Sequence, residues 1–507
     1  MKEKLKRYNP FGGEVDLTTG NLFEKMILFT IPILLLSLFQ LLYSSMDQVV
    51  VTNFGGGTES FDAIGSNSSL INLLIGLFVG VSVGANVVVA RAKGEKKPEV
   101  AHKAIESAML LSVFFGVAVG VIGYFMSPYF LQWMGTPQSY IEQSVVYLQL
   151  YFIGLPFLMI FNFGAACLRA MGDSKRPLYA LLSCGILNVV LNFLFVLGFH
   201  MQENGQDVFA VGLTTVLSQA VEAVLIVMFL IQKNKAFAWL TFKDLRLYPE
   251  ETKQILKHGI PAGLQSLVFS ISNVFIQSSV NGFGATDLDK EISVAGNSAS
   301  IQIEGYIWIV MNSFSTAVVA IVAQNYGAGN KENIKKALWM SLLSSTVLGL
   351  ALGGLAVLFY RPLLGIFLTE NGFEAVGRDH QVALDAYNQA MEVGRERLML
   401  IGLTYFLDGW MDNTSGFCRG LGHPNTPTII TFLAVTVFRL VFILTLWTMN
   451  PYVHTLMWLW STWPISWVLA VAAYYCFVPS YIKKAFKEID SRNAALQSVS
   501  PATPITH

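Results

Sequence analysis

Twelve apolar runs follow one another along this chain, each near the length of about 20 residues that a helix needs to cross the hydrocarbon core of a bilayer. They constrain the fold more than any other feature. The runs centre on residues 33–51, 70–89, 104–124, 145–168, 178–199, 209–231, 260–280, 300–322, 337–360, 398–417, 428–447 and 453–478. The sequence therefore predicts an all-α integral membrane protein with twelve transmembrane helices.

Charged residues are scarce, which excludes several other classes of protein. Of the 507 residues, 53% are hydrophobic and 13% are charged, about half the charged fraction of an ordinary soluble protein. The mean hydropathy is +0.53. Lys and Arg number 33, as do Asp and Glu, so no net field would attract the protein to nucleic acid. We expect neither a cytosolic enzyme nor a nucleic-acid-binding protein.

The basic residues are distributed asymmetrically between the two sides of the predicted membrane. With a cytoplasmic N-terminus, 27 of the 33 Lys and Arg residues fall in the cytoplasmic connections and tails, and Arg439 falls inside the eleventh run. Basic residues are enriched on the cytoplasmic side of membrane proteins. The sequence thus predicts a multi-pass protein of the cell (inner) membrane with both termini in the cytoplasm.

A basic stretch after the sixth run divides the chain into two halves. The expected parts are a cytoplasmic tail (1–20), an N-lobe with helices 1–6 (21–231), a cytoplasmic linker (232–258), a C-lobe with helices 7–12 (259–482) and a second cytoplasmic tail (483–507). The external connection 369–397 includes residues 381–392, which are too polar to span a membrane. We expect a short helix at the outer surface there.

Short motifs recur at corresponding places in the two halves. Ile31-Pro32 matches Ile260-Pro261, and the residues Arg169, Gly172 and Pro177 match Arg419, Gly422 and Pro427. The second set suits a helix end, where an Arg faces the last carbonyls, a Gly ends the helix and a Pro opens the next one. Because each half has an even number of helices, the two lobes have the same orientation and form parallel repeats around a central cleft.

These motifs resemble the multidrug and toxic compound extrusion (MATE) family. The resemblance rests on the Ile-Pro pairs, Tyr43-Ser-Ser-Met-Asp47, Gln324-Asn-Tyr-Gly327 and the duplicated Arg-x-x-Gly elements, and it covers residues 21–484. It implies a two-lobe, twelve-helix fold that exports organic cations and other amphipathic compounds against an inward flow of protons or sodium ions. It also implies a protein that works as a monomer. The wider superfamily includes lipid-linked oligosaccharide flippases.

Four polar residues at membrane depth form the predicted N-lobe site. A charge at this depth is costly, and the position of Asp47 suits a carboxylate that takes up a proton from outside and releases it towards the cytoplasm. Asn188 and Asn192 are four residues apart and share one helical face. In the family this face commonly carries an Asn and then an Asp, whereas Asn192 cannot titrate. Thr215 matches the hydroxyl that completes the cluster in relatives. Hydrogen bonding between helices is the alternative for the amides and the hydroxyl.

Two acidic residues mark a predicted C-lobe site. Asp408 and Asp412 are four residues apart on the tenth helix. Asp408 stands before Arg419 at the spacing at which sodium-coupled members of the family carry an acidic ligand. We therefore treat Asp408 as a candidate sodium ligand, and no other metal site is expected.

Further polar residues accompany these acids in the predicted spans. Sodium-coupled members use a Glu in helix 7, where this chain has the uncharged Asn273 and Gln277. Glu304 in helix 8 is a candidate second acid for the C-lobe site. Glu222 in helix 6 is a further intramembrane acid, and Arg439 is a candidate partner for one of these two carboxylates.

The chain shows no pattern of an ATP-driven transporter or an enzyme. It has no Walker A motif, and its seven histidines fall at helix ends or in loops. The sequence predicts a secondary active multidrug efflux antiporter without a cofactor, whose partners are organic cations or amphipathic drugs, a coupling proton or sodium ion, and the bilayer. A flippase of the same superfamily is the alternative, but it would need a cationic cavity for pyrophosphate. A membrane-embedded enzyme would need a nucleophile and a base at depth.

Overall fold

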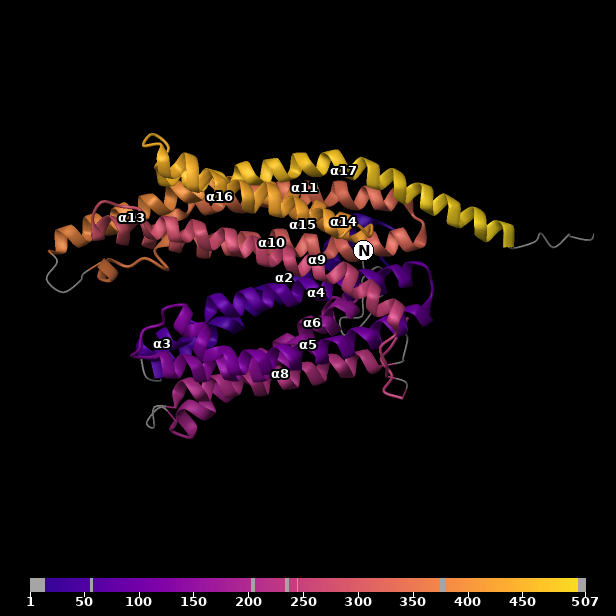
Figure 1. Cartoon of the computed structure of the whole chain (residues 1–507), viewed down its shortest axis with the longest axis horizontal. Coiled ribbons are helices and arrows are strands. Elements are labelled where there is room, and N and C mark those ends of the chain that lie inside the picture. The colour runs from indigo at the N-terminus through magenta and orange to yellow at the C-terminus, as the bar shows by residue number, and fades with distance from the viewer. Residues whose placement is uncertain are drawn as a thin grey trace, which may run out of the picture. The chain divides into compact units, whose positions relative to one another are not determined.

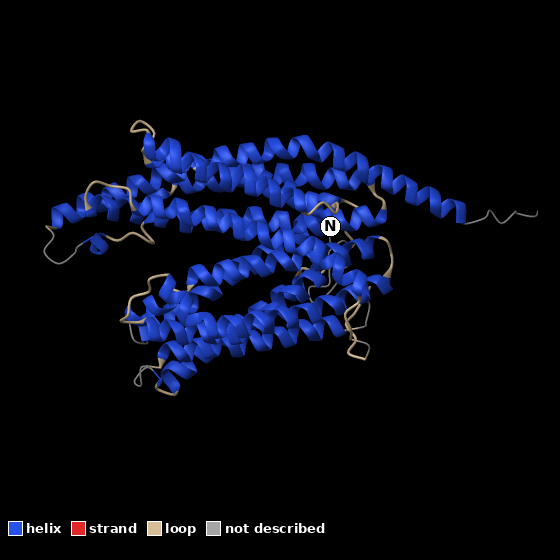
Figure 2. Cartoon of the chain, in the orientation of Figure 1, coloured by secondary structure: helices blue, strands red, loops and turns tan. Residues whose placement is uncertain are grey.

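The computed structural model describes residues 14–54, 58–201, 206–232, 237–243, 245–373 and 379–499 (Figure 1). In these ranges the regular structure is helical, and no strand is formed (Figure 2). Eleven helices of the described part are long and apolar enough to cross a membrane. The predicted all-α, multi-pass membrane fold is confirmed.

The chain forms two compact units. Unit 1 comprises Met1–Gly263 and Ala323–Asn330, and unit 2 comprises Leu264–Val322 and Lys331–His507. The division between the units falls inside α9 (Pro249–Asn281) and inside α10 (Asp287–Ala328). Each of these two long helices therefore contributes residues to both units.

Unit 1 is built around α6, which packs against α4, α5 and α8. Its helices are α2 (Leu22–Phe54), α3 (Thr58–Gly65), α4 (Ser68–Gly94), α5 (Pro98–Trp133), α6 (Ile141–Ala170), α7 (Lys175–Phe193) and α8 (Asp207–Ile231), and the π-helical turn η1 (Leu194–Gly198) continues α7. Phe163 and Ile105 are fully buried in its core. Apolar packing of this kind, together with hydrogen bonds between helices, holds a bundle together in lipid.

The Gln324-Asn-Tyr-Gly327 motif at the end of α10 belongs to unit 1. Gln324 Nε2 donates to the Ala170 carbonyl at 2.7 Å, and Asn325 Nδ2 donates to the Leu17 carbonyl at 3.0 Å. A Cβ atom on Gly327 would lie 2.3 Å from the Arg91 carbonyl oxygen, so the two backbones meet at a distance that only glycine allows. The motif thus ties the end of α10 to α4, to α6 and to the segment before α2.

Unit 2 contains the remaining helices. They are α11 (Lys331–Leu358), α12 (Tyr360–Leu364), η3 (Glu370–Phe373), α13 (His380–Leu400), η4 (Gly402–Thr404), α14 (Tyr405–Gly420), α15 (Asn425–Ile430), η5 (Thr431–Val437), α16 (Phe438–Phe442), η6 (Ile443–Trp447) and α17 (Leu456–Val499). The elements from α15 to η6 follow one another without a break and form one candidate span, Asn425–Trp447.

The external connection differs from its prediction in length and in burial. The short helix expected over 381–392 is α13, a helix of 21 residues whose first turn is capped by Asp379 through a 3.0 Å bond from the Gln381 amide. Its last turn contains Arg397, which was expected in the external connection but is only 2% exposed. Arg397 is therefore a residue of the unit 2 core rather than of an outer loop.

The tenth predicted span, 398–417, is interrupted in the structure. After Leu400 the chain makes the tight turn η4, and α14 has 16 residues, fewer than the other spans. At the turn, Gly353 of α11 approaches so closely that a Cβ on it would lie 2.1 Å from the Gly402 carbonyl oxygen. Glycine is a poor helix former, and the close contact with α11 stabilises the turn in place of a continuous helix.

A pair of glycines four residues apart performs the same role in both units. In α5, a Cβ on Gly116 would lie 2.5 Å from Pro156 Cα, and one on Gly120 would lie 2.7 Å from the Phe152 carbonyl oxygen, both on α6. In α11, Gly349 and Gly353 meet α14 and η4 in the same way. Small residues at this spacing let helix backbones approach closely in lipid.

Candidate functional site

The four predicted N-lobe residues form one hydrogen-bonded cluster in unit 1. Thr215 Oγ1 donates to Asp47 Oδ2 at 2.7 Å, and Asn192 Nδ2 donates to Asp47 Oδ1 at 3.1 Å. Asn188 Nδ2 donates to Thr215 Oγ1 at 3.2 Å, while Asn188 Oδ1 accepts a bond of 3.2 Å from Asn192 Nδ2. The structure therefore brings together residues of α2, α7 and α8 that are up to 168 positions apart in the sequence.

Two further residues complete this cluster, and sequence reasoning did not select them. Tyr147 Oη of α6 donates to Asp47 Oδ2 at 3.1 Å, and Thr214 Oγ1 donates to Asn192 Oδ1. A tyrosine in an apolar run has the same pattern as a packing residue, so the sequence carries no signal for Tyr147. Thr214 adjoins Thr215, and the direction of each side chain around α8 decides which of the two faces Asp47.

The chemistry of the cluster follows from its composition. Asp47 is 4% exposed, and Asn188 and Asn192 are fully buried. The donors to Asp47 are neutral hydroxyl and amide groups rather than a cation. Neutral donors can solvate a buried carboxylate without neutralising it. The cluster can therefore hold a single exchangeable positive charge at Asp47.

The predicted C-lobe residues do not meet in one cluster. Glu304 of α10 is bound by Arg397, with Nε to Oε1 at 2.9 Å and Nη2 to Oε2 at 2.8 Å. Arg397 Nη1 also donates to Asn297 Oδ1 at 2.9 Å, and Asn297 Nδ2 donates to Gln277 Oε1 at 3.1 Å. Glu304 and Gln277 thus belong to one network that is centred on Arg397. Arg439 was a candidate partner for either Glu304 or Glu222, and the Glu304 alternative is wrong because Arg397 binds both of its carboxylate oxygens.

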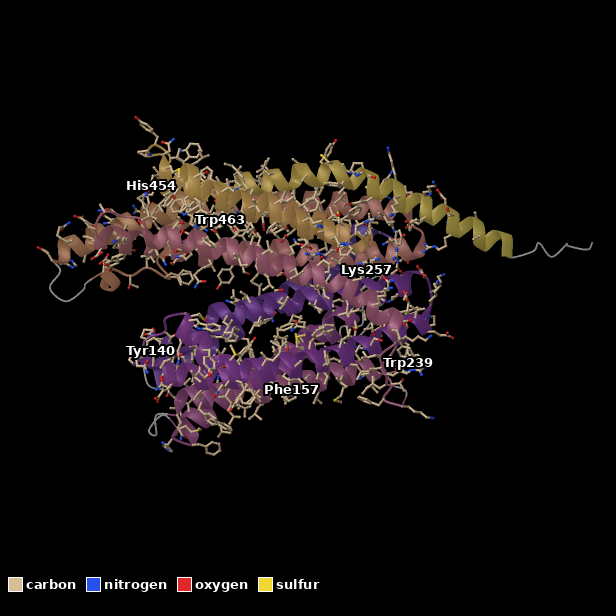
Figure 3. The ribbon with its side chains drawn as sticks, in the orientation of Figure 1. Tyr140, Phe157, Trp239, Lys257, His454 and Trp463 are labelled. Atoms are coloured by element: carbon tan, nitrogen blue, oxygen red, sulfur yellow. The ribbon has the colours of Figure 1, made fainter. Side chains whose placement is uncertain are left out.

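Asn273 belongs to a second network, which is centred on Arg439. Arg439 is fully buried, and its Nη1 donates to Asn273 Oδ1 at 3.2 Å while its Nε donates to Ser466 Oγ at 3.0 Å. The ring centroid of Trp463, labelled in Figure 3, lies 5.0 Å from Arg439 Cζ and 4.8 Å from Arg397 Cζ. A tryptophan ring at this distance attracts a guanidinium, so Trp463 contacts both buried arginines.

In the described residues, Asp408 and Asp412 share no side-chain hydrogen bond with either network. Asp408 is 2% exposed, and its Oδ2 makes no hydrogen bond. In the described part of unit 2, no hydrogen bond joins the carboxylate of Asp408 or Asp412 to Glu304, Asn273 or Gln277. Asp412 and the cation of Arg439 both act electrostatically on Asp408. No group of three or more His, Cys, Asp or Glu side chains within the described ranges is placed to hold a metal ion.

Comparison with known families decides to which family these two units belong. A family model described as MatE matches residues 32–194 and 261–445. The chain belongs to the MATE family of transporters. Each of the two matches begins at the proline of an Ile-Pro pair, Pro32 or Pro261, so the MATE pattern occurs once in each half of the chain.

Several curated proteins and solved structures are similar to this MATE chain. "Probable multidrug resistance protein YpnP" of Bacillus subtilis (strain 168) is 30% identical over 63% of this chain and 68% of its own length. "Probable multidrug resistance protein YoeA" of the same strain is 25% identical over 82% and 85%. A crystal structure of a MATE protein in complex with MaL6 has a TM-score of 0.81 at 22% identity and covers 94% of this chain and 100% of that one. The solved structure shows that the fold is that of MATE transporters.

The duplicated motif of this MATE chain has the same backbone conformation in both units. Gly172 and Gly422 have φ angles of +84° and +91°, and each amide donates to the carbonyl three residues earlier, Arg169 or Arg419, at 2.9 Å. The amide of the next residue closes a second 2.9 Å bond, to the Leu168 carbonyl in unit 1 and to the Cys418 carbonyl in unit 2. This pair of backbone hydrogen bonds, together with a glycine in the left-handed conformation, ends a helix. Pro177 and Pro427 then lie in the first turns of α7 and α15.

Proposed function

We propose that this MATE protein is a secondary active multidrug efflux antiporter, which exports amphipathic or cationic organic compounds in exchange for a proton or sodium ion by alternating access. The observation that carries the proposal is the buried Asp47 carboxylate, whose two oxygens are bound by neutral donors. The names of two relatives, "Probable multidrug resistance protein YpnP" and "Probable multidrug resistance protein YoeA", support the substrate class. The protein lies in the cell (inner) membrane with both termini in the cytoplasm and works as a monomer.

Exchange at Asp47 links the two fluxes. A carboxylate with neutral donors can be neutralised by a proton or by a bound organic cation, and one excludes the other. Coupling requires that each ligand stabilise a different orientation of the transporter, because a ligand shifts a conformational equilibrium only by its differential affinity. The proton that enters from outside therefore releases the outgoing substrate.

We favour a proton over sodium as the coupling ion. A sodium site needs several oxygen ligands with at least one negative charge, and the candidate acids of unit 2 meet this requirement poorly. Both oxygens of Glu304 are bound by Arg397, and the charge of Arg439 acts on Asp408. The Asp47 cluster instead presents hydroxyl groups, which can exchange a proton with the carboxylate.

The contacts of the two buried arginines weigh against a flippase for a pyrophosphate-linked lipid. Such a protein needs cations that are open to the phosphates. Arg397 is already bound by the carboxylate of Glu304, and Arg439 already donates to Asn273 and Ser466. Efflux of an organic cation needs neither arginine as a ligand.

The test is the flux of ethidium, a fluorescent cation, in proteoliposomes with an imposed proton or sodium gradient. We expect the proton gradient to drive ethidium transport by the wild type and not by Asp47→Asn. The control is Asp62→Asn, because Asp62 is an exposed acid of the same unit. Unchanged transport by Asp47→Asn would remove this residue from the coupling. Loss of sodium-driven transport alone in Asp408→Asn would move the coupling to sodium and to unit 2.

A further inference from the structure

Glu222 of α8 is a buried carboxylate that the exchange at Asp47 does not use. It is 3% exposed, and its Oε1 makes no hydrogen bond. No ion pair joins it to a Lys or Arg of the described chain. A buried carboxylate oxygen without a hydrogen bond lowers stability, so a packing role does not account for Glu222.

A line of hydroxyl groups on α8 leads from Asp47 to Glu222. Thr215, Ser218 and Glu222 follow one another at spacings of three and four residues, which places them on one face of the helix. Thr215 Oγ1 is bonded to Asp47 Oδ2. Ser218 is fully buried, and its Oγ has no hydrogen-bond partner. A polar side chain thus occurs at each turn over a rise of about 10 Å.

Two titratable side chains of neighbouring helices, Tyr43 and Cys184, interact electrostatically with Glu222. Tyr43 of α2, one turn from Asp47, interacts electrostatically with Asp47, with Cys184 and with Glu222, and its hydroxyl makes no hydrogen bond of normal geometry. Cys184 of α7, one turn from Asn188, donates through Sγ to the Ser218 carbonyl at 3.0 Å. Tyr43, Cys184, Ser218 and Glu222 therefore form a second polar layer beside the Asp47 cluster.

We propose that Glu222 is a second proton-binding residue of unit 1, which receives the proton that Asp47 releases. The inference rests on the proposed proton exchange at Asp47. In the transfer, the O–H bond of the Asp47 carboxylic acid breaks and an O–H bond forms on the Glu222 carboxylate. The hydroxyls of Thr215 and Ser218 each give up one proton and receive another, so they end unchanged. The Tyr43 hydroxyl provides a second route for the proton between the same two carboxylates, Asp47 and Glu222.

The direction of this transfer follows from the course of the helices. With the N-terminus in the cytoplasm, α2 and α7 run outwards and α8 runs inwards. Tyr43 and Cys184 precede Asp47 and Asn188 by one turn, and Glu222 follows Thr215 by two turns. All three therefore lie on the cytoplasmic side of the Asp47 cluster, and a proton on Glu222 has moved towards the cytoplasm.

The experiment compares two modes of ethidium transport in proteoliposomes. Proton-driven transport requires the complete transfer, whereas exchange of ethidium for ethidium at equal pH on both sides does not. We expect Glu222→Gln to slow proton-driven transport about a hundredfold, the effect of losing a positioned proton-transfer group, and to leave the exchange rate near that of the wild type. Glu222→Asp should restore part of the driven rate.

Variants that remove a single hydroxyl group distinguish a loss of proton transfer from a folding defect. Ser218→Ala and Tyr43→Phe each remove one hydroxyl, and together they should slow driven transport without slowing the exchange. Ser112→Ala is the matched control, because Ser112 is a fully buried serine of α5 that bonds only to the Met109 carbonyl of its own helix. If Glu222→Gln matches the wild type, or slows both modes equally, the inference is wrong. If the wild type itself shows no proton-driven transport, the proposed function fails first.

Discussion

The Arg397 guanidinium binds both carboxylate oxygens of Glu304, at distances of 2.9 and 2.8 Å. The two residues are 2% and 3% exposed. A buried pair with two parallel hydrogen bonds has a defined geometry, and removal of one partner leaves the other charge without compensation. The pair therefore connects α13, the helix of the external connection, to α10.

We expect Glu304→Gln to destabilise the protein by about 3–5 kcal/mol, because it leaves Arg397 buried and unpaired. Thermal unfolding of the purified protein in detergent measures the change. The matched control is Glu392→Gln, which breaks the exposed 2.9 Å pair with Arg395 on the same helix and should leave the melting temperature unchanged. The double variant Glu304→Leu/Arg397→Met should recover part of the loss. Equal melting temperatures for the two single variants would contradict the prediction.

Adjacent glycines in α11 provide a test of the close helix contact. A Cβ on Gly353 would lie 2.1 Å from the Gly402 carbonyl oxygen, whereas a Cβ on Gly354 has no heavy atom within 4 Å. We expect Gly353→Ala to destabilise the protein by about 1–3 kcal/mol through overpacking. Gly354→Ala should be neutral or stabilising by up to about 1 kcal/mol, since alanine favours the helix. The measurement is the melting temperature of each variant, which should be lower for Gly353→Ala than for Gly354→Ala. The reverse order would contradict the close contact between Gly353 and Gly402.

A second carboxylate at the Asp47 cluster should change the pH dependence of transport. Asn192→Asp places an acid where the amide now lies 3.1 Å from Asp47 Oδ1. Two carboxylates at this distance share a proton and titrate in two separate steps. We expect the initial rate of ethidium export to depend on pH over a wider range than in the wild type. The swapped variant Asp47→Asn/Asn192→Asp, with one carboxylate, should return to a single step. A profile of Asn192→Asp that superimposes on the wild type would count against a shared site.

We expect transport to depend on the hydroxyl group of Thr215 and not only on the volume of its side chain. It donates to Asp47 and accepts from Asn188, and a hydrogen bond to a charged group contributes about 1.5–3 kcal/mol. We expect Thr215→Val to reduce proton-driven ethidium export about tenfold or more, while Thr215→Ser retains it. Thr30→Val is the control, since Thr30 is a buried threonine of α2 that bonds only within its own helix. Equal export by the Val and Ser variants would show that the hydroxyl has no part.

The N-lobe cluster was predictable because helical spacing and depth constrain it. Asn188 and Asn192 share a face at any rotation of α7, and a polar face inside a bundle must meet other polar groups. Tyr147, which donates to Asp47, was not predictable, since a tyrosine in an apolar run has the same pattern as a packing residue. The C-lobe prediction rested on the depth of the acids and on the spacing between Asp408 and Arg419. It could not foresee that Arg397, assigned to the outer connection, would bind Glu304.

Several features of this protein follow from the sequence alone. Long apolar runs in a chain with few charges can be stable only as helices in a bilayer, where each helix satisfies its own backbone hydrogen bonds. The Arg-x-x-Gly motifs set helix ends at Gly172 and Gly422, because a left-handed residue there is favourable for glycine. These are local or solvent-driven effects, which do not depend on the partner of any one side chain.

The partners of the buried charges depend on the tertiary structure. Asp47 is bound by hydroxyls and an amide, Glu304 by a guanidinium, and Glu222 has no hydrogen bond at Oε1, although all three are acids in apolar helices. Their different environments arise from the rotation and packing of helices that are far apart in the sequence. In a medium without water, the group that packs against a carboxylate determines whether it is paired or free to exchange a proton.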